Sequence, residues 1–198
     1  EAALCEPLAV ALHAVGQAGS LVGKRVLVTG AGPIGALVIA AARYAGAMEV
    51  VATDLHEAAL LKAVAMGASR TVNVAQAPGL AAEEFCAQKG YFDVAFECTG
   101  VGAVIQDILP ALCPCGTLVQ VGVTGEAAIP INVIVGKEIQ IVGAFRFHGE
   151  YALAARLIKE GRINVKPIIT ATLPMERAVE AFEMAADRKT HMKVQLAF

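Results

Sequence analysis

Three glycines at the end of an apolar, β-branched run could hold a phosphate group. In "VLVTGAGPIGALVIAAA", Gly30, Gly32 and Gly35 form Gly-x-Gly-x-x-Gly, and Pro33 and Ile34 begin a helical pattern within it. Gly30 permits a tight turn, Gly32 lets the backbone approach a pyrophosphate, and Gly35 allows close packing of helix on strand. The helix N-terminus adds free N–H groups and a positive dipole end. The pattern predicts a dinucleotide site, with a purely structural turn as the alternative.

An acidic residue ends the next apolar run. Asp54 closes "VVATD" 19 residues after Gly35, where a carboxylate accepts hydrogen bonds from the adenosine ribose hydroxyls. The same charge repels a 2′-phosphate, and the following Leu55 and His56 supply no arginine to hold one. NAD is therefore expected, and NADP is disfavoured. The alternative is that Asp54 caps the helix that follows.

Two later stretches, "VQVGV" at Val119–Val123 and "GAFRF" at Gly143–Phe147, end strands on the side where ligands bind. This location suits the nicotinamide end of the cofactor. Arg146 stands in an apolar setting and could meet a pyrophosphate or a carboxylate. A surface ion pair is the alternative for Arg146.

Glu6 opens the first apolar helical stretch, "EAALCEPLAVALHAV". An acid before Pro7 is most often a solvated residue of a helix start. No other candidate ligand lies at a metal-site spacing from it, so the residues alone favour that interpretation over a metal ligand.

The elements that must position these residues alternate short β-branched runs with longer helical patterns, which is typical of a parallel sheet covered on both faces. Six strands in this rhythm predict a doubly wound α/β sheet of the dinucleotide-binding kind. Strands are expected at Arg25–Gly30, Glu49–Asp54, Thr71–Val74, Phe92–Glu97, Thr117–Val121 and Ile139–Ala144, and helices at Ile34–Tyr44, Glu57–Met66, Leu80–Gln88 and Val101–Leu112.

The alternation of strand and helix patterns ends after Ala144. A helix at Glu150–Lys159 is followed by a tail that reads strand, helix, strand, in which the last strand at Lys193–Phe198 has no obvious partner. Pro174 is expected to open the tail helix. Its buried face should carry Met175, Val179, Phe182 and Ala186.

Composition excludes several classes of function. A net charge of -2 with scattered lysines and arginines predicts no nucleic-acid partner. The long uncharged runs are interrupted by glycine, proline and polar residues, so no membrane span is expected. Five cysteines without framework spacing favour a reducing, cytoplasmic compartment. Because 57% of the residues are hydrophobic, some apolar surface should face a neighbour, and a homo-oligomer is expected.

Together these stretches resemble the zinc-dependent medium-chain dehydrogenases, in the branch of sorbitol dehydrogenase and L-idonate 5-dehydrogenase. The resemblance covers essentially the whole sequence and rests on "CEPLAVALHAV", "GAGPIG", "KGYFDVAFECTG", "VQVGV", "GKEI", "FRFHGEY" and "KVQLAF", which look most like L-idonate 5-dehydrogenase. It implies that Glu6 is the acid of the zinc site, where it binds the metal or its water and contacts substrate. It also implies cofactor contacts from the following residues: Ile34, Asp54, Val121, Gly122, Val123, Phe145, Arg146 and Phe147.

The sequence departs from the family in two respects. The family's cysteine and histidine–glutamate zinc ligands have no counterpart, so we expect a catalytic domain upstream of this sequence. A family arginine near the adenosine ribose is Ala59 here, which weakens the expected preference for NAD.

We therefore expect a hinge helix at 1–15, a dinucleotide-binding domain at 16–145, and a segment at 146–198 that returns to the catalytic domain. As the resemblance implies, the intact enzyme would oxidise a small polyol or aldonate, with L-idonate converted to 5-dehydrogluconate, using NAD and zinc. This portion alone should bind NAD without turnover. The alternatives are a zinc-free medium-chain reductase and a non-catalytic NAD(H)-sensing module.

Overall fold

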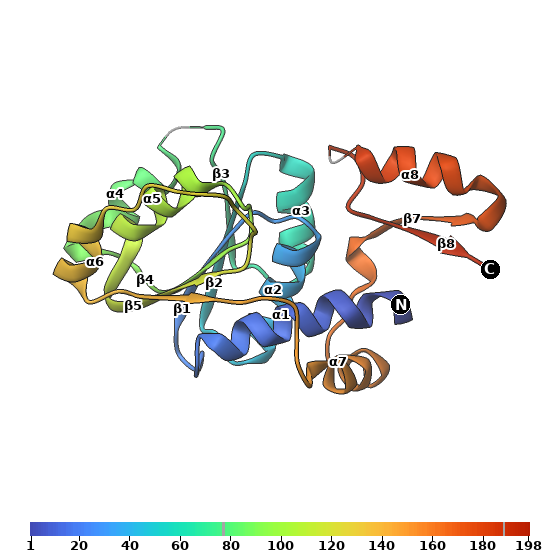
Figure 1. Cartoon of the computed structure of the whole chain (residues 1–198), viewed down its shortest axis with the longest axis horizontal. Coiled ribbons are helices and arrows are strands. Elements are labelled where there is room, and N and C mark those ends of the chain that lie inside the picture. The colour runs from blue at the N-terminus through green and yellow to red at the C-terminus, as the bar shows by residue number, and fades with distance from the viewer. Residues whose placement is uncertain (77, 188) are drawn as a thin grey trace.

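A six-stranded parallel sheet is the centre of the computed structural model, which describes residues 1–76, 78–187 and 189–198. The strand order is β3-β2-β1-β4-β5-β6, and every neighbouring pair is parallel (Figure 1). This confirms the doubly wound arrangement, whose strand order reverses between β1 and β4. The strands are β1 (Arg25–Thr29), β2 (Glu49–Asp54), β3 (Arg70–Asn73), β4 (Phe92–Glu97), β5 (Leu112–Gln120) and β6 (Gln140–Gly143).

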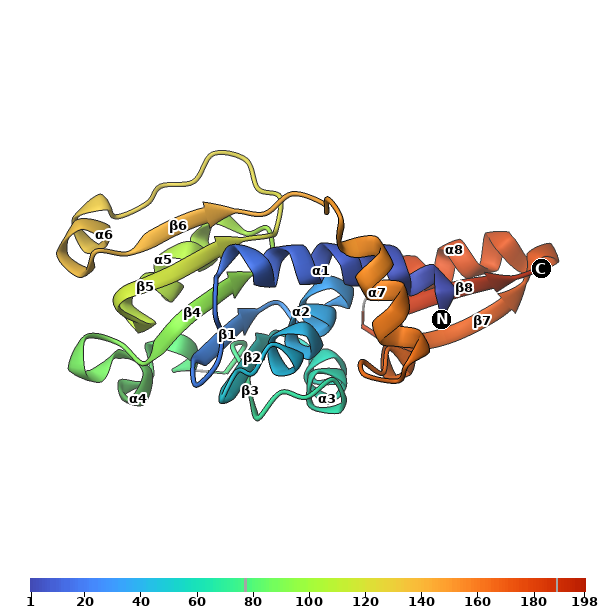
Figure 2. The ribbon, with the colours of Figure 1, turned by 90° about the horizontal axis from the view of Figure 1, so that it is seen from below.

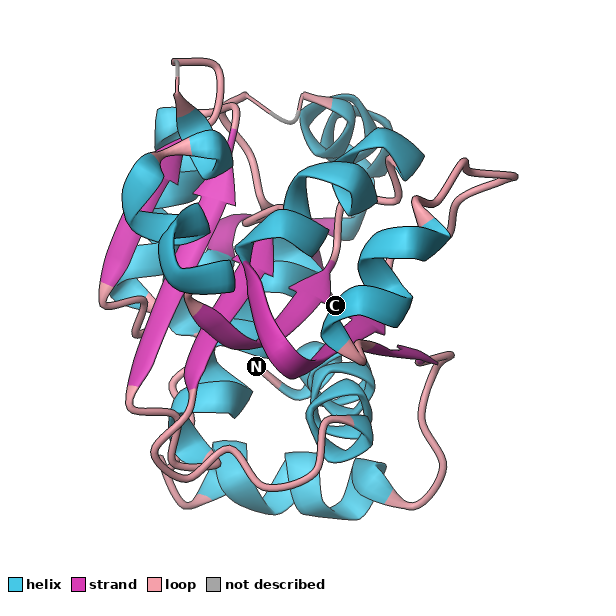
Figure 3. Ribbon diagram, turned by 90° about the vertical axis from the view of Figure 1, so that its left-hand side faces the viewer, coloured by secondary structure: helices cyan, strands magenta, loops and turns pink. Residues whose placement is uncertain are grey.

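Helices cover both faces of the sheet (Figure 3). On one side lie α1 (Cys5–Gln17), which follows the short helix η1 (Ala2–Leu4), with α2 (Pro33–Tyr44) and α3 (Glu57–Ala65). On the other lie η2 (Gly79–Ala81), α4 (Glu83–Cys86), η3 (Ala87–Lys89), α5 (Gly102–Ala111) and α6 (Ile131–Lys137). None of the helices that the structure describes has the length and apolarity of a membrane span.

The central strands β1, β2 and β4 are buried on both faces because their side chains alternate between two cores. In β1, Val26 and Val28 join the core beneath α1 and α2, whereas Leu27 joins the core beneath α5. All three are fully buried. Such two-sided burial explains why the strands read as continuous apolar runs.

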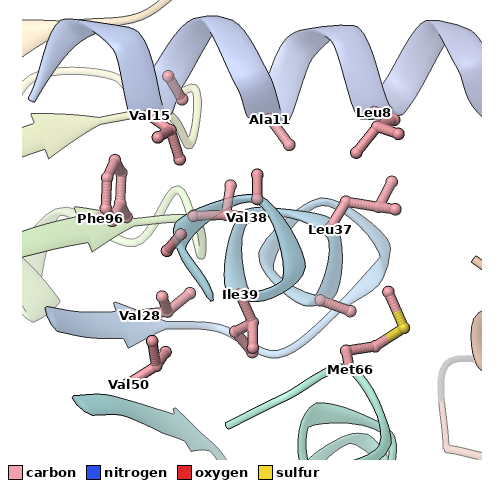
Figure 4. Close-up of a cluster of buried hydrophobic side chains, with 14 of the residues drawn as sticks. Leu8, Ala11, Val15, Val28, Leu37, Val38, Ile39, Val50, Met66 and Phe96 are labelled. Carbon is pink, nitrogen blue, oxygen red and sulfur yellow. The ribbon is translucent and has the colours of Figure 1, made fainter. Parts of the chain in front are cut away.

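The main partner of helix α1 is α2. Leu8, Ala11 and Val15 recur at the helical period and face Leu37 and Val38 of α2 (Figure 4). All five side chains are buried. The apolar stripe of the first helical stretch therefore anchors it to the helix that begins at the glycine loop.

The tail forms a separate two-stranded sheet (Figure 2). Helix α7 (Glu150–Lys159) lies against α1, and the chain continues through η4 (Lys166–Ile168), β7 (Ile169–Pro174), η5 (Met175–Arg177), α8 (Ala178–Ala186) and β8 (Lys193–Ala197). The expectation that the last strand lacks a partner was wrong, because β8 pairs in parallel with β7.

One predicted helix differs from the structure, and one helix of the structure was not predicted. The single helix expected at Leu80–Gln88 is divided into η2, α4 and η3, because Ala82 and Ala87 have extended backbones with ψ of 138° and 155°. These breaks still allow Leu80 and Phe85 to be buried. Helix α6 was not predicted, since its run of β-branched residues lacks a helical period.

The buried face predicted for α8 is exposed. Val179 and Phe182 are each 75% exposed, and Met175 and Ala186 are also exposed. Ala181 is the buried residue of the helix. A two-stranded sheet has room to cover only a narrow face of the helix, so the larger apolar face is not covered by the described residues. Pro174 ends β7 and precedes the short helix η5 instead of opening α8 directly.

Candidate cofactor-binding site

The glycine loop joins the end of β1 to the start of α2. Gly30 donates its N–H to the carbonyl oxygen of Thr53 at 2.8 Å, which fastens the loop to the end of β2. Gly32 is the N-cap of α2, and Pro33 occupies the first helical turn. Gly32 has no side chain that could cap the helix. The free N–H groups of the first turn therefore stay available to an anion.

The three glycines are required for different reasons. Gly30 has a φ of +82°, and a Cβ there would lie 2.9 Å from Cγ2 of Thr99. A Cβ on Gly35 would lie 1.8 Å from the carbonyl oxygen of Gly30. At Gly32 the backbone is extended, with φ of −65°, and a Cβ would meet nothing within 4 Å. Packing within the chain therefore explains Gly30 and Gly35, whereas the bare backbone at Gly32 leaves space that fits a pyrophosphate.

Asp54 holds the glycine loop as well as the end of β2. Its Oδ2 accepts a hydrogen bond from the Ala31 N–H at 2.8 Å, and Oδ1 accepts one from the His56 N–H at 2.9 Å. The alternative role as a helix cap was wrong, because α3 begins at Glu57 with His56 as its uncapped N-cap. Asp54 is half-buried beside the loop.

A cavity of about 810 Å³ opens at the carboxyl ends of β1, β2 and β4. Six of the predicted cofactor residues line it, namely Gly30, Gly32, Pro33, Ile34, Gly35 and Asp54. The remaining predicted residues, Glu6, Val121–Val123 and Phe145–Phe147, lie outside its lining.

Sequence reasoning missed several of the residues around this cavity. Lys62 lines it from α3, and Thr170 and Lys189–Met192 line it from the distant tail. The tail residues carry no local motif, and only the folding of the tail beside the glycine loop brings them there. Lys62 and Lys189 add positive charge to a cavity that also contains a helix N-terminus.

The end of β4 supplies a second group of residues beside the loop. Glu97 is fully buried there, and Cys98 and Thr99 line the cavity. Burial raises the pKa of the Cys98 thiol, and the adjacent Glu97 carboxylate raises it further. Cys98 is therefore a neutral thiol at physiological pH and not a thiolate nucleophile. The sequence signal that could have indicated Glu97 is an acid that ends a mostly apolar strand.

The residues predicted at the nicotinamide end follow β5 and β6. Val121 and Gly122 each donate a backbone hydrogen bond to the carbonyl oxygen of Glu97, at 2.9 and 2.8 Å. Arg146 has a φ of 56°, which is uncommon for a residue with a side chain and is enriched at functional sites. Its guanidinium carbon lies 5.5 Å from the ring centroid of Phe145. The alternative of a surface ion pair is wrong for the described part of the chain, where Arg146 makes none.

Side chains of α1 contact the start of α7, which follows Phe145–Phe147 in the chain. Nδ1 of the buried His13 lies 2.9 Å from Oε1 of Glu150, and the rings of His13 and His148 are tilted by 35° with centroids 4.6 Å apart. Oε2 of Glu150 accepts the His148 N–H at 2.7 Å. Burial of the Glu150 carboxyl favours its neutral form, but hydrogen bonds from His13 and from backbone N–H groups outweigh this effect, so its pKa is lowered.

The contribution of Glu150 to stability is expected to depend on pH. A carboxyl whose pKa is lowered in the folded state stabilises that state above its ordinary value of 4.5, and this contribution is lost as the pH falls through the lower folded pKa. Glu150→Gln should therefore lower the free energy of unfolding at neutral pH, and the difference from wild type should shrink below about pH 4. Urea unfolding of both proteins at several pH values checks this. A difference that stays constant into acid would contradict it.

Glu6 occupies the first turn of α1 and is exposed. This position agrees with the favourable placement of an acid at a helix start. Among the described residues, no three histidine, cysteine, aspartate or glutamate side chains are grouped so that they could hold a metal ion. The described residues therefore do not fit a complete zinc site, and the metal role of Glu6 stays a prediction.

Comparison with known proteins agrees with this geometry. The family model described as zinc-binding dehydrogenase matches residues 33–160. L-idonate 5-dehydrogenase (NAD(P)(+)) of Escherichia coli (strain K12) is 40% identical over 197 residues, which cover 99% of this chain and 57% of that protein. Sorbitol dehydrogenase of Gallus gallus is 40% identical over 186 residues, which cover 92% of this chain and 52% of that protein.

Solved structures contain the fold of this chain over its whole length. The crystal structure of L-idonate 5-dehydrogenase from Escherichia coli matches with a TM-score of 0.94 at 40% identity, covering 100% of this chain and 56% of that one. The structure of 2R,3R-butanediol dehydrogenase from Bacillus subtilis matches with a TM-score of 0.91 at 32% identity, covering 99% and 57%. The chain thus spans little more than half the length of these relatives. It belongs to the zinc-binding medium-chain dehydrogenase family.

Proposed function

We propose that this chain is the cofactor-binding portion of a zinc-dependent polyol or aldonate dehydrogenase that uses NAD. The observation that carries the proposal is Gly32, whose bare backbone faces open space at the N-terminus of a 12-residue helix. The helix N-terminus would hold the pyrophosphate, and Asp54 would accept the adenosine ribose hydroxyls. When bound, the nicotinamide supplies the hydride acceptor.

The preference for NAD over NADP rests on the charge of Asp54. A carboxylate at the end of β2 disfavours a 2′-phosphate, and Leu55 and His56 bring no guanidinium beside it. Lys62 and Lys189 line the same cavity, however, and cations there favour any phosphate. The relative in Escherichia coli carries NAD(P)(+) in its name, so a direct comparison of the two cofactors is needed.

For the substrate we propose L-idonate, oxidised to 5-dehydrogluconate by the whole protein as a homo-oligomer. The support is the similarity to L-idonate 5-dehydrogenase, which extends over 99% of this chain. A sorbitol dehydrogenase is equally identical over 92% of it, so polyol oxidation has similar support. Because the described residues do not form a three-ligand metal site, we expect this chain alone to bind cofactor without turnover. Oxidation of L-idonate by the isolated chain would contradict this.

Gly32→Ala tests the cofactor site most directly. Alanine adopts the extended backbone of Gly32 without strain, and its methyl group meets no atom of the chain. The variant should keep the melting temperature of the wild type but bind NADH about tenfold more weakly, a loss of about 1.4 kcal/mol.

The measurement is a fluorescence titration of both proteins with NADH and NADPH, with circular dichroism to confirm folding. Tighter binding of NADH than NADPH by wild type is expected. Equal NADH affinity of variant and wild type would remove Gly32 from the site. Failure of a well-folded wild type to bind either cofactor would overturn the proposed function.

A further inference from the structure

A fully buried carboxylate stands where the strand order of the sheet reverses. Glu97 ends β4, the strand beside β1, and is 0% exposed. No cationic side chain of the residues described forms an ion pair with it. A buried charge without a cation is costly unless hydrogen bonds satisfy it.

Four neutral donors satisfy this carboxylate. Oε1 accepts the Thr99 N–H at 2.7 Å and also the Thr99 hydroxyl. That hydroxyl in turn accepts the Val101 N–H at 2.9 Å, so its own hydrogen is directed to Glu97. Oε2 accepts the Gly100 N–H at 3.1 Å and Nε2 of Gln120 at 2.6 Å. In every one of these hydrogen bonds the carboxylate is the acceptor.

The same residue connects two loops. Its carboxylate holds the loop after β4 through Thr99 and Gly100, and its carbonyl oxygen accepts the N–H groups of Val121 and Gly122 after β5. Gln120 connects the Glu97 carboxylate with the loop after β5, since its Nε2 also donates to the carbonyl oxygen of Gly122 at 2.7 Å.

The two loops approach so closely at Gly122 that no side chain fits there. A Cβ on Gly122 would lie 2.2 Å from the Gly100 nitrogen and 2.7 Å from Oε2 of Glu97. On the other side, Thr99 contacts the place where a Gly30 side chain would lie. The carboxylate therefore sets the distance between the loop after β4 and the loop after β5.

We infer that Glu97 is a positioning residue for the nicotinamide half of the cofactor, an inference that rests on the proposed function. The glycine loop and Asp54 occupy the β1 and β2 half of the sheet, where pyrophosphate and adenosine ribose would bind. In a doubly wound sheet the second half of a dinucleotide extends across the reversal point toward β4 and β5. Glu97 holds together the loops at that second half.

Glu97→Gln tests this role with almost no change in volume. The amide replaces one acceptor oxygen with an NH₂ group, which must face a donor of Thr99, Gly100 or Gln120. We expect the variant to bind NADH about tenfold more weakly, the scale of leaving one buried polar group unsatisfied. Its affinity for ADP-ribose, which lacks the nicotinamide, should change by less than about twofold, because the glycine loop and Asp54 are untouched.

Asp93→Asn is the matched control. Asp93 lies on the same strand at the opposite edge of the sheet, where Oδ2 accepts the Arg25 N–H at 2.8 Å. The substitution removes the negative charge that pairs with the Arg25 side chain, whose Nε lies 3.7 Å from Oδ2, so it should cost stability. The ratio of NADH to ADP-ribose affinity should stay at the wild-type value. Gln120→Met serves as a second variant should Glu97→Gln fail to fold; it removes one donor and should shift the same ratio by about threefold.

The measurement is isothermal titration of wild type and variants with NADH and with ADP-ribose. A selective loss of NADH affinity in Glu97→Gln, or in Gln120→Met if the first variant does not fold, supports the inference. Equal losses for both ligands, or an unchanged ratio, would show that Glu97 is merely structural. If a folded wild type binds neither ligand, the proposed function itself fails.

Discussion

Gly35→Ala is expected to lower the free energy of unfolding by about 3 kcal/mol, the upper range for overpacking a well-packed site. The new Cβ would lie 1.8 Å from the Gly30 carbonyl oxygen, a backbone atom that cannot move without the loop. Either α2 or the glycine loop must shift, so NADH binding should be lost together with stability. For a chain of this size the melting temperature should fall by roughly 6 to 12 °C.

Gly16→Ala is the control for this prediction. Gly16 lies near the end of α1, and a Cβ there would meet nothing within 4 Å. The substitution should raise stability by about 0.5 to 1 kcal/mol, because alanine loses less backbone entropy than glycine in a helix. Thermal unfolding and NADH titration of both variants give the comparison. A Gly35→Ala protein as stable as wild type would show that the helix and loop are not packed as described.

Asp54→Gly is expected to weaken NADH binding by about 1.5 to 3 kcal/mol, the range for hydrogen bonds to a charged group. This corresponds to a loss of roughly 10- to 150-fold in affinity. NADPH should lose much less, because removal of the carboxylate also removes its repulsion of the 2′-phosphate. The ratio of NADH to NADPH affinity should therefore fall.

The ratio separates recognition of the ribose from a general effect on the loop. Asp54 also accepts the Ala31 N–H, so its loss could loosen the glycine loop, and that would weaken both cofactors equally. Glu57→Gln is the nearby control, since the Glu57 carboxylate accepts a hydrogen bond from Asn73 and lies outside the cavity lining. Equal NADH affinity in wild type and Asp54→Gly would exclude Asp54 from the site.

Local sequence patterns were sufficient for the parts of the site that adjacent residues build. The strand, glycine loop and helix around Gly30, Gly32 and Gly35 follow one another directly, so spacing alone predicted their arrangement. Asp54 was found by the same means, because it ends the next strand of the same sheet. The single helix predicted at Leu80–Gln88 was wrong. Short helical segments bury Leu80 and Phe85 as well as one helix would.

By itself, the sequence determined the parallel sheet and the position of the glycine loop, because hydrophobic periodicity and glycine spacing act over a few residues. Only the tertiary structure decided which distant groups surround that loop. Lys189 reaches the cavity from the tail, His13 and Glu150 meet across helices far apart in sequence, and β8 finds its partner in β7. The network around Glu97 likewise depends on the pairing of β4 with β5. Such contacts depend on which elements become neighbours, and no local pattern encodes that choice.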